Sequence, residues 1–391
     1  MKPARILQAL VLVAALILTS GEHVNRPARA DPPATNRAGA FFADPKTSER
    51  TELAGSIDDI NDPTWLNLEF EPRHVIRHRV AILPVENRTA EAEQAVKTPE
   101  VKTRLPGSHS AKKGEKPSVV AEIPVAGIEE LLTSAILGTD RFYLVDRKAV
   151  DEAVAAQTAA GGDAGPNAAR LGRALGAQYL VIATVNEWVP QVAKKGFAGG
   201  GISTKFLGGL GVEQASSLVR MTVRIVDAST GQIVASISPT GTRAKTKLGL
   251  GALGLSSRSL AGVGGSLDRN APITQALLIA VNKAVYHVVD ELAGRPWQGV
   301  VSGISDERIY VNAGSNIGMT VGTKLTVLSR GKEINDPDTG VSLGFETREI
   351  GVIEVVTVEE RMSIAKVVSG CDGLKESDFV RAKPSATGSG T

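Results

Sequence analysis

The chain has 391 residues, of which 42% are hydrophobic, 41 are glycine and only 4% are aromatic. This length and hydrophobic content allow two ordinary domains with real cores, and the scarcity of aromatic residues argues against a large aromatic-lined pocket. The formal net charge is +2, and without residues 1–30 the chain has 40 basic and 41 acidic residues, so there is no global positive field to attract nucleic acid.

Residues 1–30 have the pattern of an export signal. A positively charged start is followed by the apolar stretch Ile6–Leu18, which is too short for an ordinary membrane span, and then by an A-x-A cleavage site at residues 28–30. An N-terminal membrane anchor is the alternative. Gly21 stands where a lipoprotein cleavage box would need its lipidated cysteine. We therefore expect an exported protein without a lipid anchor.

Residues 31–75 contain several prolines and little hydrophobic periodicity. This composition predicts a flexible or extended N-terminal arm. Trp65, Leu66 and Phe70, near the end of the arm, are candidates for docking on a neighbour.

Strands and helices alternate in the pattern of residues 76–295. Apolar runs at 79–85, 141–145 and 179–185 predict strands, and the third run is apolar on both faces and is therefore expected at the centre of a sheet. Helices are expected to begin at Pro124 and after a cap at Asp146. A separate short helix is expected to end near Gly176, and a long helix is expected from Pro272 to Leu292. The order β-α-β-α-α-β predicts a sheet covered by helices.

A strand over 218–226, a tight turn at Asp227–Gly231 and a returning strand over 232–238 complete this part of the chain. Residues 296–383 instead show short β-prone runs separated by turn signals, such as Asn335–Gly340, which predicts a separate small β-barrel or sandwich. Residues 384–391 are expected to be a disordered tail. The predicted fold class is an α/β (α+β) domain with two Gly-rich β-hairpin extensions, followed by a small all-β C-terminal domain.

Four segments, in order along the chain, resemble the CsgG family of curli production assembly and transport components. They are Arg79–Val85, Leu131–Ala135 leading into Arg141–Arg147, Leu175–Val181, and Arg224–Val234. The resemblance covers about residues 79–294. It implies a periplasmic α/β domain that assembles side by side into a ring, and in the secretion channel itself two hairpins per subunit close a shared outer-membrane β-barrel. Residues 314–322 and 336–340 resemble the C-terminal domain of the flagellar protein FlgT, which implies an interaction module.

The two candidate hairpins lie at about 187–217 and 239–270. Barrel strands need about 9–11 residues with apolar side chains at every second position. The candidate lipid-facing residues are Ile202, Phe206, Leu210, Val212, Leu248 and Leu250. The candidate residues of the pore base or lumen are Lys205, Arg243, Lys245 and Lys247. A thin aromatic girdle, a weakly alternating return strand over 256–267 and the missing lipid anchor weigh against membrane hairpins. The predicted function is nevertheless an outer-membrane-associated ring or channel component, and the alternative is a soluble periplasmic ring scaffold with two Gly-rich surface hairpins.

No catalytic, cofactor or metal site is expected. Residues 249–254 spell G-x-G-x-x-G, but a cationic run precedes them where a dinucleotide site needs an apolar strand. His74 and His78 are four residues apart, yet arginines surround them, so we expect surface histidines rather than metal ligands. Cys371 is a single cysteine, which excludes an intramolecular disulfide. The predicted partners are other copies of the chain and exported or envelope-assembly proteins, not nucleic acid.

Overall fold

The computed structural model describes eight stretches of the chain. They are residues 36–44, 47–52, 60–89, 125–159, 168–190, 216–244, 271–338 and 342–382. All of them belong to one compact unit, Asn36–Thr391. The predicted export signal, most of both candidate hairpins and the predicted tail lie outside the described residues.

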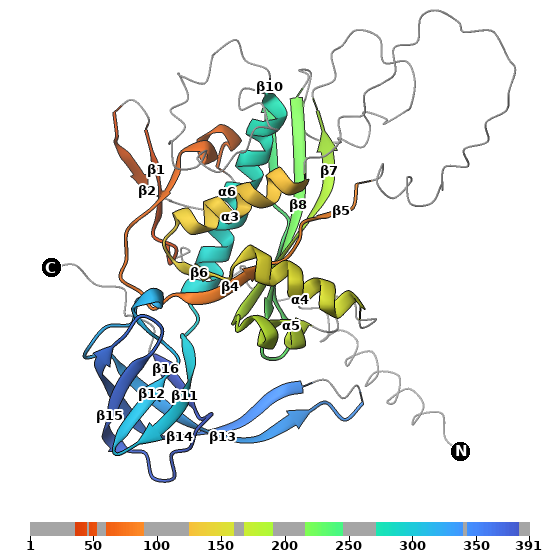
Figure 1. Cartoon of the computed structure of the whole chain (residues 1–391). Helices are drawn as coiled ribbons and strands as arrows, with labels where there is room; N and C mark the ends of the chain where they lie inside the picture. The colour runs from red at the N-terminus through yellow and green to blue at the C-terminus, as the bar shows by residue number, and fades with distance from the viewer. Residues whose placement is uncertain are drawn as a thin grey trace, which may run out of the picture. The chain divides into compact units, whose positions relative to one another are not determined.

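A mixed sheet with the order β10-β8-β7-β4-β6 forms the centre of the fold (Figure 1). β4 is parallel to β6 and β7, whereas β8 is antiparallel to β7 and to β10. Two further strands join the sheet, β5 beside β7 and β9 beside β8. The bounds are β4 (His78–Ile82), β5 (Glu86–Asn87), β6 (Phe142–Leu144), β7 (Tyr179–Val189), β8 (Ser216–Asp227), β9 (Ile233–Ile237) and β10 (Thr240–Ala244). The predicted central position of the strand at 179–185 is confirmed, because β7 is the third of five strands and these residues are all buried.

Helices cover both faces of this sheet. They are α3 (Val125–Gly138), α4 (Arg147–Ala159), α5 (Ala168–Leu175) and α6 (Pro272–Ala293). Alternate residues of β4 point to opposite faces, so Val80 joins the core with α3 and α6, while Ala81 joins the core with α4 and α5. The mixed α/β architecture predicted from the alternating strands and helices is therefore confirmed.

Two aspartates make the local contacts that the sequence predicts, one at a helix start and one in a turn. The side chain of Asp146 accepts hydrogen bonds from the backbone N–H groups of Lys148 (3.0 Å) and Ala149 (3.4 Å), which caps the start of α4. The Asp227 carboxylate accepts a bond from the Ser229 N–H (2.8 Å) in the turn between β8 and β9. Both acids are thus satisfied by local backbone groups.

Helix α6 is buried on nearly all sides, whereas a helix at the surface of a domain normally buries only one face. One side packs on β8 and β10, and the approach to β10 is very close. A Cβ at Gly241 would lie 2.0 Å from the carbonyl oxygen of Ala276 and 2.8 Å from the N–H nitrogen of Ala280. Only glycine permits that contact. Among the described residues no helix, α6 included, is long and apolar enough to cross a membrane.

The other side of α6 is covered by the segment for which we expected a flexible arm. Residues 36–75 include β1 (Ala40–Ala43), β2 (Arg50–Glu52), a 3-10 helix η2 (Asp62–Asn67) and β3 (Leu68–Phe70), and the three strands form a small antiparallel sheet. Trp65 is 1% exposed and meets the rings of Phe42 at 5.4 Å and Tyr286 at 5.9 Å. The prediction of a flexible arm is wrong for these described stretches, because their large apolar side chains complete the core over α6.

The C-terminal part forms a closed barrel with the order β11-β12-β15-β14-β13-β16. The bounds are β11 (Gln298–Ser305), β12 (Arg308–Val311), a 3-10 turn η5 (Ser315–Ile317), β13 (Lys324–Asn335), β14 (Ser342–Val358), β15 (Ser363–Gly370) and β16 (Phe379–Ala382). The barrel has its own core, which includes Val311, Leu325 and Val355. Closure leaves the strands within the barrel without a free edge.

We expect Gly241→Ala to lower the free energy of unfolding by about 1–3 kcal/mol, because the new methyl group overlaps the backbone of α6. Gly138→Ala is the matched control. A Cβ at Gly138, the last residue of α3, meets no atom within 4 Å, so this change should be neutral or stabilising by up to about 1 kcal/mol. Denaturant unfolding of both variants would measure the difference. Equal stabilities for the two variants would contradict the close packing of β10 on α6.

Candidate functional site

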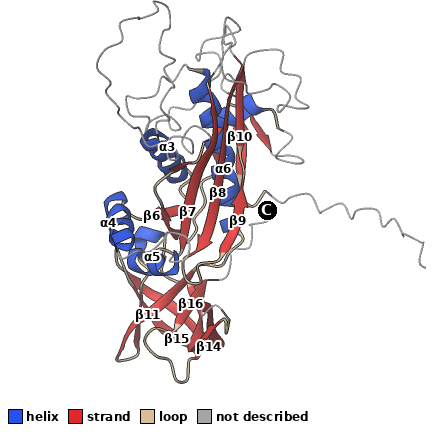
Figure 2. Ribbon diagram, turned by 90° about the vertical axis from the view of Figure 1, so that its right-hand side faces the viewer, coloured by secondary structure: helices blue, strands red, loops and turns tan. Residues whose placement is uncertain are grey.

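Both Gly-rich segments of the sequence leave the fold at one end of the central sheet. β7 ends at Val189 and β8 begins at Ser216, while β10 ends at Ala244 and α6 begins at Pro272. In the sheet, Val189 pairs with Leu218 and Ser216 pairs with Ala244. We call this end, defined by Val189, Ser216 and Ala244, the exit end. Figure 2 shows the three strands β7, β8 and β10 running side by side toward it.

Arg243 lies at the exit end and is the one predicted site residue inside the described stretches. The alternating pattern placed its side chain toward water. In the structure it is only 8% exposed, and its Nε donates a hydrogen bond of 2.7 Å to Oε1 of Gln275 on α6. Burial lowers the pKa of the guanidinium. The face of β10 that carries Gly241 and Arg243 is thus turned toward α6, so Arg243 does not point to open water in this chain.

The other nine predicted residues lie outside the described residues, and the predictions for them stay predictions. They are the six candidate lipid-facing residues Ile202, Phe206, Leu210, Val212, Leu248 and Leu250, and the three lysines Lys205, Lys245 and Lys247.

A partly buried acid, Asp62, holds the exit end to the N-terminal segment. Asp62 of η2 accepts hydrogen bonds from Thr242 of β10 and from the Nζ of Lys283 on α6. The same Nζ donates to the carbonyl oxygen of Thr240 at 2.9 Å. Asp62 thereby connects η2 with β10 and with α6. Sequence reasoning missed this cluster, because an isolated Asp in an expected arm carries no pattern that points to a lysine more than two hundred residues away.

The side of β7 and β8 near the exit end carries further polar groups. Nη1 of Arg220 forms an ion pair of 2.7 Å with Oε1 of Glu187. The indole nitrogen of Trp188 and the hydroxyl of Ser217 are buried and have no hydrogen-bond partner among the described residues. An unpartnered buried polar group costs about 1–3 kcal/mol. The exit end is therefore a place where additional polar contacts would stabilise the fold.

The α/β part and the barrel meet through backbone and side-chain hydrogen bonds around β4. The Arg77 N–H donates to the carbonyl oxygen of Ile317 at 2.7 Å, and Nη2 of Arg79 donates to that of Asn312 at 3.4 Å. Gln178 bridges the two parts, since its Oε1 accepts from the Arg79 N–H at 2.9 Å and its Nε2 donates to the Gln298 carbonyl oxygen. These contacts define a structured junction within Asn36–Thr391.

His78 lies inside this junction, which corrects the prediction of a surface histidine. Its side chain is 7% exposed, its Nε2 is 3.3 Å from the carbonyl oxygen of Arg295, and its ring meets the ring of Tyr179 edge-on at 5.3 Å. Burial, the largest cause, lowers the pKa of His78, and the charge of Arg295 acts in the same direction. His74 is exposed, as expected. The two histidines thus differ in burial and do not form a pair.

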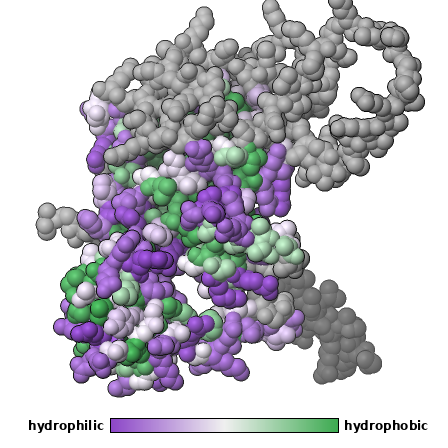
Figure 3. All heavy atoms as spheres, viewed as in Figure 1, coloured by the Kyte–Doolittle hydropathy of each residue, from purple (hydrophilic) through white to green (hydrophobic). Residues whose placement is uncertain are grey.

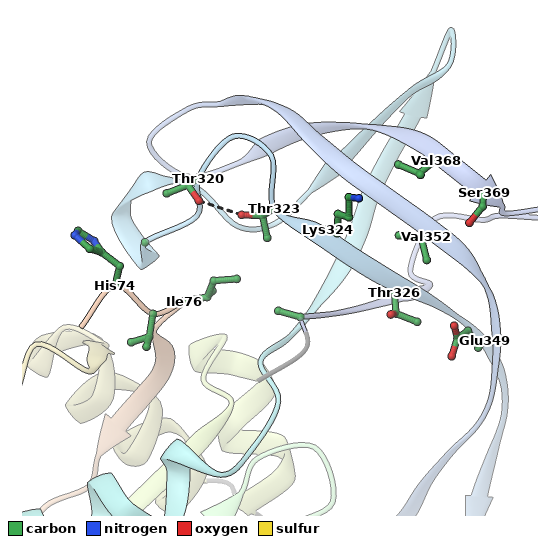
Figure 4. A pocket seen from close by; sticks show the side chains of 13 residues that line it. His74, Ile76, Thr320, Thr323, Lys324, Thr326, Glu349, Val352, Val368 and Ser369 are labelled. Carbon is green, nitrogen blue, oxygen red and sulfur yellow. Dashed lines mark hydrogen bonds between the residues drawn. The ribbon is translucent and has the colours of Figure 1, made fainter. Parts of the chain in front are cut away.

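A groove of about 560 Å³ lies beside the junction (Figure 4). Residues 74–76 form one side and barrel strands the other, and Thr320 and Thr323 share a hydrogen bond of 3.1 Å at its rim. Lys324 and Glu349 bring one positive and one negative charge to the lining. The barrel surface also carries exposed apolar side chains, among them Val321 and Val368. Figure 3 shows hydrophobic and hydrophilic residues mixed over the side of the molecule that is seen in Figure 1. The lining thus combines polar, charged and apolar side chains.

We expect the junction to weaken in acid because of His78. Its pKa is near 6.5 in the unfolded chain and lower in the folded chain, so below about pH 6.5 the unfolded state takes up a proton that the folded state resists. The free energy of unfolding should therefore fall as the pH falls, by up to about 1.4 kcal/mol per pH unit from this group.

His78→Gln should remove that part of the slope between pH 7.5 and 5.0, as followed by denaturant unfolding at several pH values. His74→Gln, at an exposed histidine, should leave the slope unchanged. An unaltered pH dependence in His78→Gln would show that the buried histidine is not the source.

Comparison with known proteins finds one matching family. A family model described as curli production assembly/transport component CsgG matches residues 108–314, which is more than half of the chain. No curated protein matches the chain at a significant level.

Three solved structures illustrate the similarity. The hypothetical protein CT253 from Chlamydia trachomatis is 13% identical, with 56% of this chain and 99% of that chain covered at a TM-score of 0.33. Lipoprotein GNA1162 from Neisseria meningitidis is 15% identical, with coverages of 47% and 95% at 0.27. The PelC dodecamer from Paraburkholderia phytofirmans is 16% identical, with coverages of 50% and 94% at 0.22. At these identities and scores, none of the three bears on function.

Proposed function

The chain belongs to the family of the curli production assembly/transport component CsgG, and on that premise we propose that it is a ring-forming channel component at the outer membrane. In this role it secretes or assembles cell-surface material of the curli type. The observation that carries the proposal is the exit end. Two Gly-rich segments, 191–215 and 245–270, are bounded by Val189, Ser216 and Ala244, which are neighbours in one sheet.

Paired strands at the exit end suit a continuation into barrel hairpins. An antiparallel pair such as β7 and β8 can extend past the domain with its hydrogen-bond ladder unbroken, and a spanning strand needs about 9–11 residues. The sequence between them supplies alternating apolar positions at Ile202, Phe206 and Leu210, and the segment after β10 supplies Leu248 and Leu250. These side chains would face lipid in the proposed channel.

The proposed activity is performed by geometry and not by bond chemistry. A water-filled barrel closed by hairpins from several copies lets an extended chain pass, and no bond is made or broken. Lys205, Lys245 and Lys247 would face the water of the pore or its base. We infer that residues 1–30 direct export to the periplasm, that the protein is no enzyme, and that no cofactor, metal or nucleic acid takes part.

The second candidate function is a soluble periplasmic ring scaffold with a role like that of FlgT. The structured junction favours it, because the barrel is hydrogen-bonded to the α/β part through Arg77, Arg79 and Gln178. A barrel held in this way would present partner-binding surfaces in a defined direction around a ring. Under this alternative the Gly-rich segments stay at the protein surface, and the barrel, with the likeness of its sequence to the FlgT C-terminal domain, binds an envelope-assembly partner.

Leu250→Arg tests the channel against the scaffold. If Leu250 faces lipid, an arginine there costs about 2–4 kcal/mol at the middle of the bilayer, so the variant should lose membrane insertion while its soluble part stays folded. Gly249→Arg is the matched control, because the same charge at the neighbouring position would face water and should be tolerated.

The measurement is the fraction of each full-length variant that needs detergent for extraction from the cell envelope. The channel predicts a large drop for Leu250→Arg and none for Gly249→Arg. Normal detergent-requiring behaviour of Leu250→Arg would count against the channel, and loss of insertion in both variants would show that the two faces are not distinguished as proposed.

A further inference from the structure

The longest strands of the barrel continue beyond it as a two-stranded arm. β13 pairs with β16 only up to Leu328, and β14 pairs with β15 only from Gly351 onward. Between these points β13 and β14 pair only with each other, from Ser329↔Arg348 to Asn335↔Ser342. We call residues 329–338 and 342–349 the arm, and Figure 1 shows it reaching out from the barrel.

The base of the arm is held firmly against the barrel. The guanidinium of Arg330 stacks 3.9 Å from the ring centre of Phe345 and 5.3 Å from that of Phe379 on β16. The two rings lie 5.9 Å apart. The Arg330 N–H also donates a hydrogen bond of 2.8 Å to the carboxylate of Asp378. The arm therefore leaves the barrel in a fixed direction, which lowers the entropy lost when it binds a partner.

The outer half of the arm exposes large apolar side chains that nothing in the described part of the chain covers. An isolated two-stranded ribbon is at best marginally stable in water. Near the tip, Ile334 is 49% and Leu343 is 48% exposed. The arm also carries five carboxylates against three cations, a net charge of −2, with Glu333 and Asp338 close to the tip. Its chemistry fits a basic surface with a small apolar component.

Helix α5 offers such a surface on the same chain. Its inner side is buried through Ala168 and Leu171, while Arg170 and Arg173 lie on its exposed side, three residues apart. The helix contains no acidic residue. Within the described stretches neither arginine has an ion-pair partner. Ala174, next to Arg173, is also exposed and adds apolar surface.

We propose that the acidic arm of one copy docks on Arg170 and Arg173 of the next copy. The arm and α5 are different patches of one surface, so their contact is heterologous, and repeated heterologous contacts generate a ring when the rotation closes. A second copy is the occupant favoured by charge complementarity, because the chain itself carries the matching basic helix. The inference rests on the proposed ring and identifies the contact that joins its subunits.

Charge reversal on the full-length protein tests the contact. The arm variant is Glu333→Lys with Asp338→Lys, and the α5 variant is Arg170→Glu with Arg173→Glu. Each should raise the concentration needed for half-assembly at least about tenfold, because like charges then face each other across the contact. Lys366→Glu, at an exposed residue of β15 outside the arm, is the control and should assemble like the unchanged protein.

Restoration separates a direct contact from damaged folding. A chain with both sets of reversals should assemble again, and an equal mixture of the two separately reversed chains should co-assemble, because each arm then meets a complementary helix. Sedimentation velocity in detergent measures the assembled fraction in every case.

Three results are decisive. Loss in each variant with recovery in the combination supports the docking. Assembly of both reversed variants at the normal concentration overturns the docking while leaving the proposed ring intact. A wild-type protein that stays monomeric overturns the ring, and the docking with it.

Discussion

The contact between α6 and β10 is the constraint on which the rest of this fold depends. Helix α6 has 22 residues and carries apolar side chains on nearly every side. It has to be covered all round, because leaving its apolar surface in contact with water would be unfavourable. The sheet covers one side, and it comes so close at Gly241 that the backbone of β10 touches that of α6. The N-terminal segment covers the other side with Trp65 and Leu66.

This packing also positions the end of the molecule where function is proposed. β10 packs against α6, β8 pairs with β10, and β7 pairs with β8. The packing of β10 on α6 therefore fixes the position of the exit end. Asp62 adds a polar clamp between η2, β10 and Lys283. The Gly-rich segments therefore begin from a fixed base. In the proposed channel, this base is the root of the two hairpins.

Sequence patterns predict the parts of this fold that carry a clear local signal, such as a continuous apolar run, a helix cap or helical periodicity. The run 179–185, in which only Thr184 is polar, identifies the central strand, Asp146 identifies a helix start, and the apolar positions of 272–292 identify α6. The structure of residues 36–75 is not predicted, because their buried side chains occur in short irregular pieces without helical or strand periodicity. The arm is not predicted either, because both of its faces are exposed beyond Leu328 and its sequence therefore lacks alternating hydrophobic residues. Arg243 and His78 are missed because a charged or titratable residue gives no local sign that a distant helix or carbonyl group will bury it.

The central claim, a CsgG-family ring whose exit end serves a membrane channel, is tested most directly by fractionating cells that express the full-length protein. The envelope is extracted first by osmotic shock, then with carbonate, and finally with detergent. We predict release from the outer membrane only by detergent, as a large oligomer. Recovery of the protein in the osmotic-shock fraction would contradict the channel and leave the periplasmic scaffold as the function to pursue.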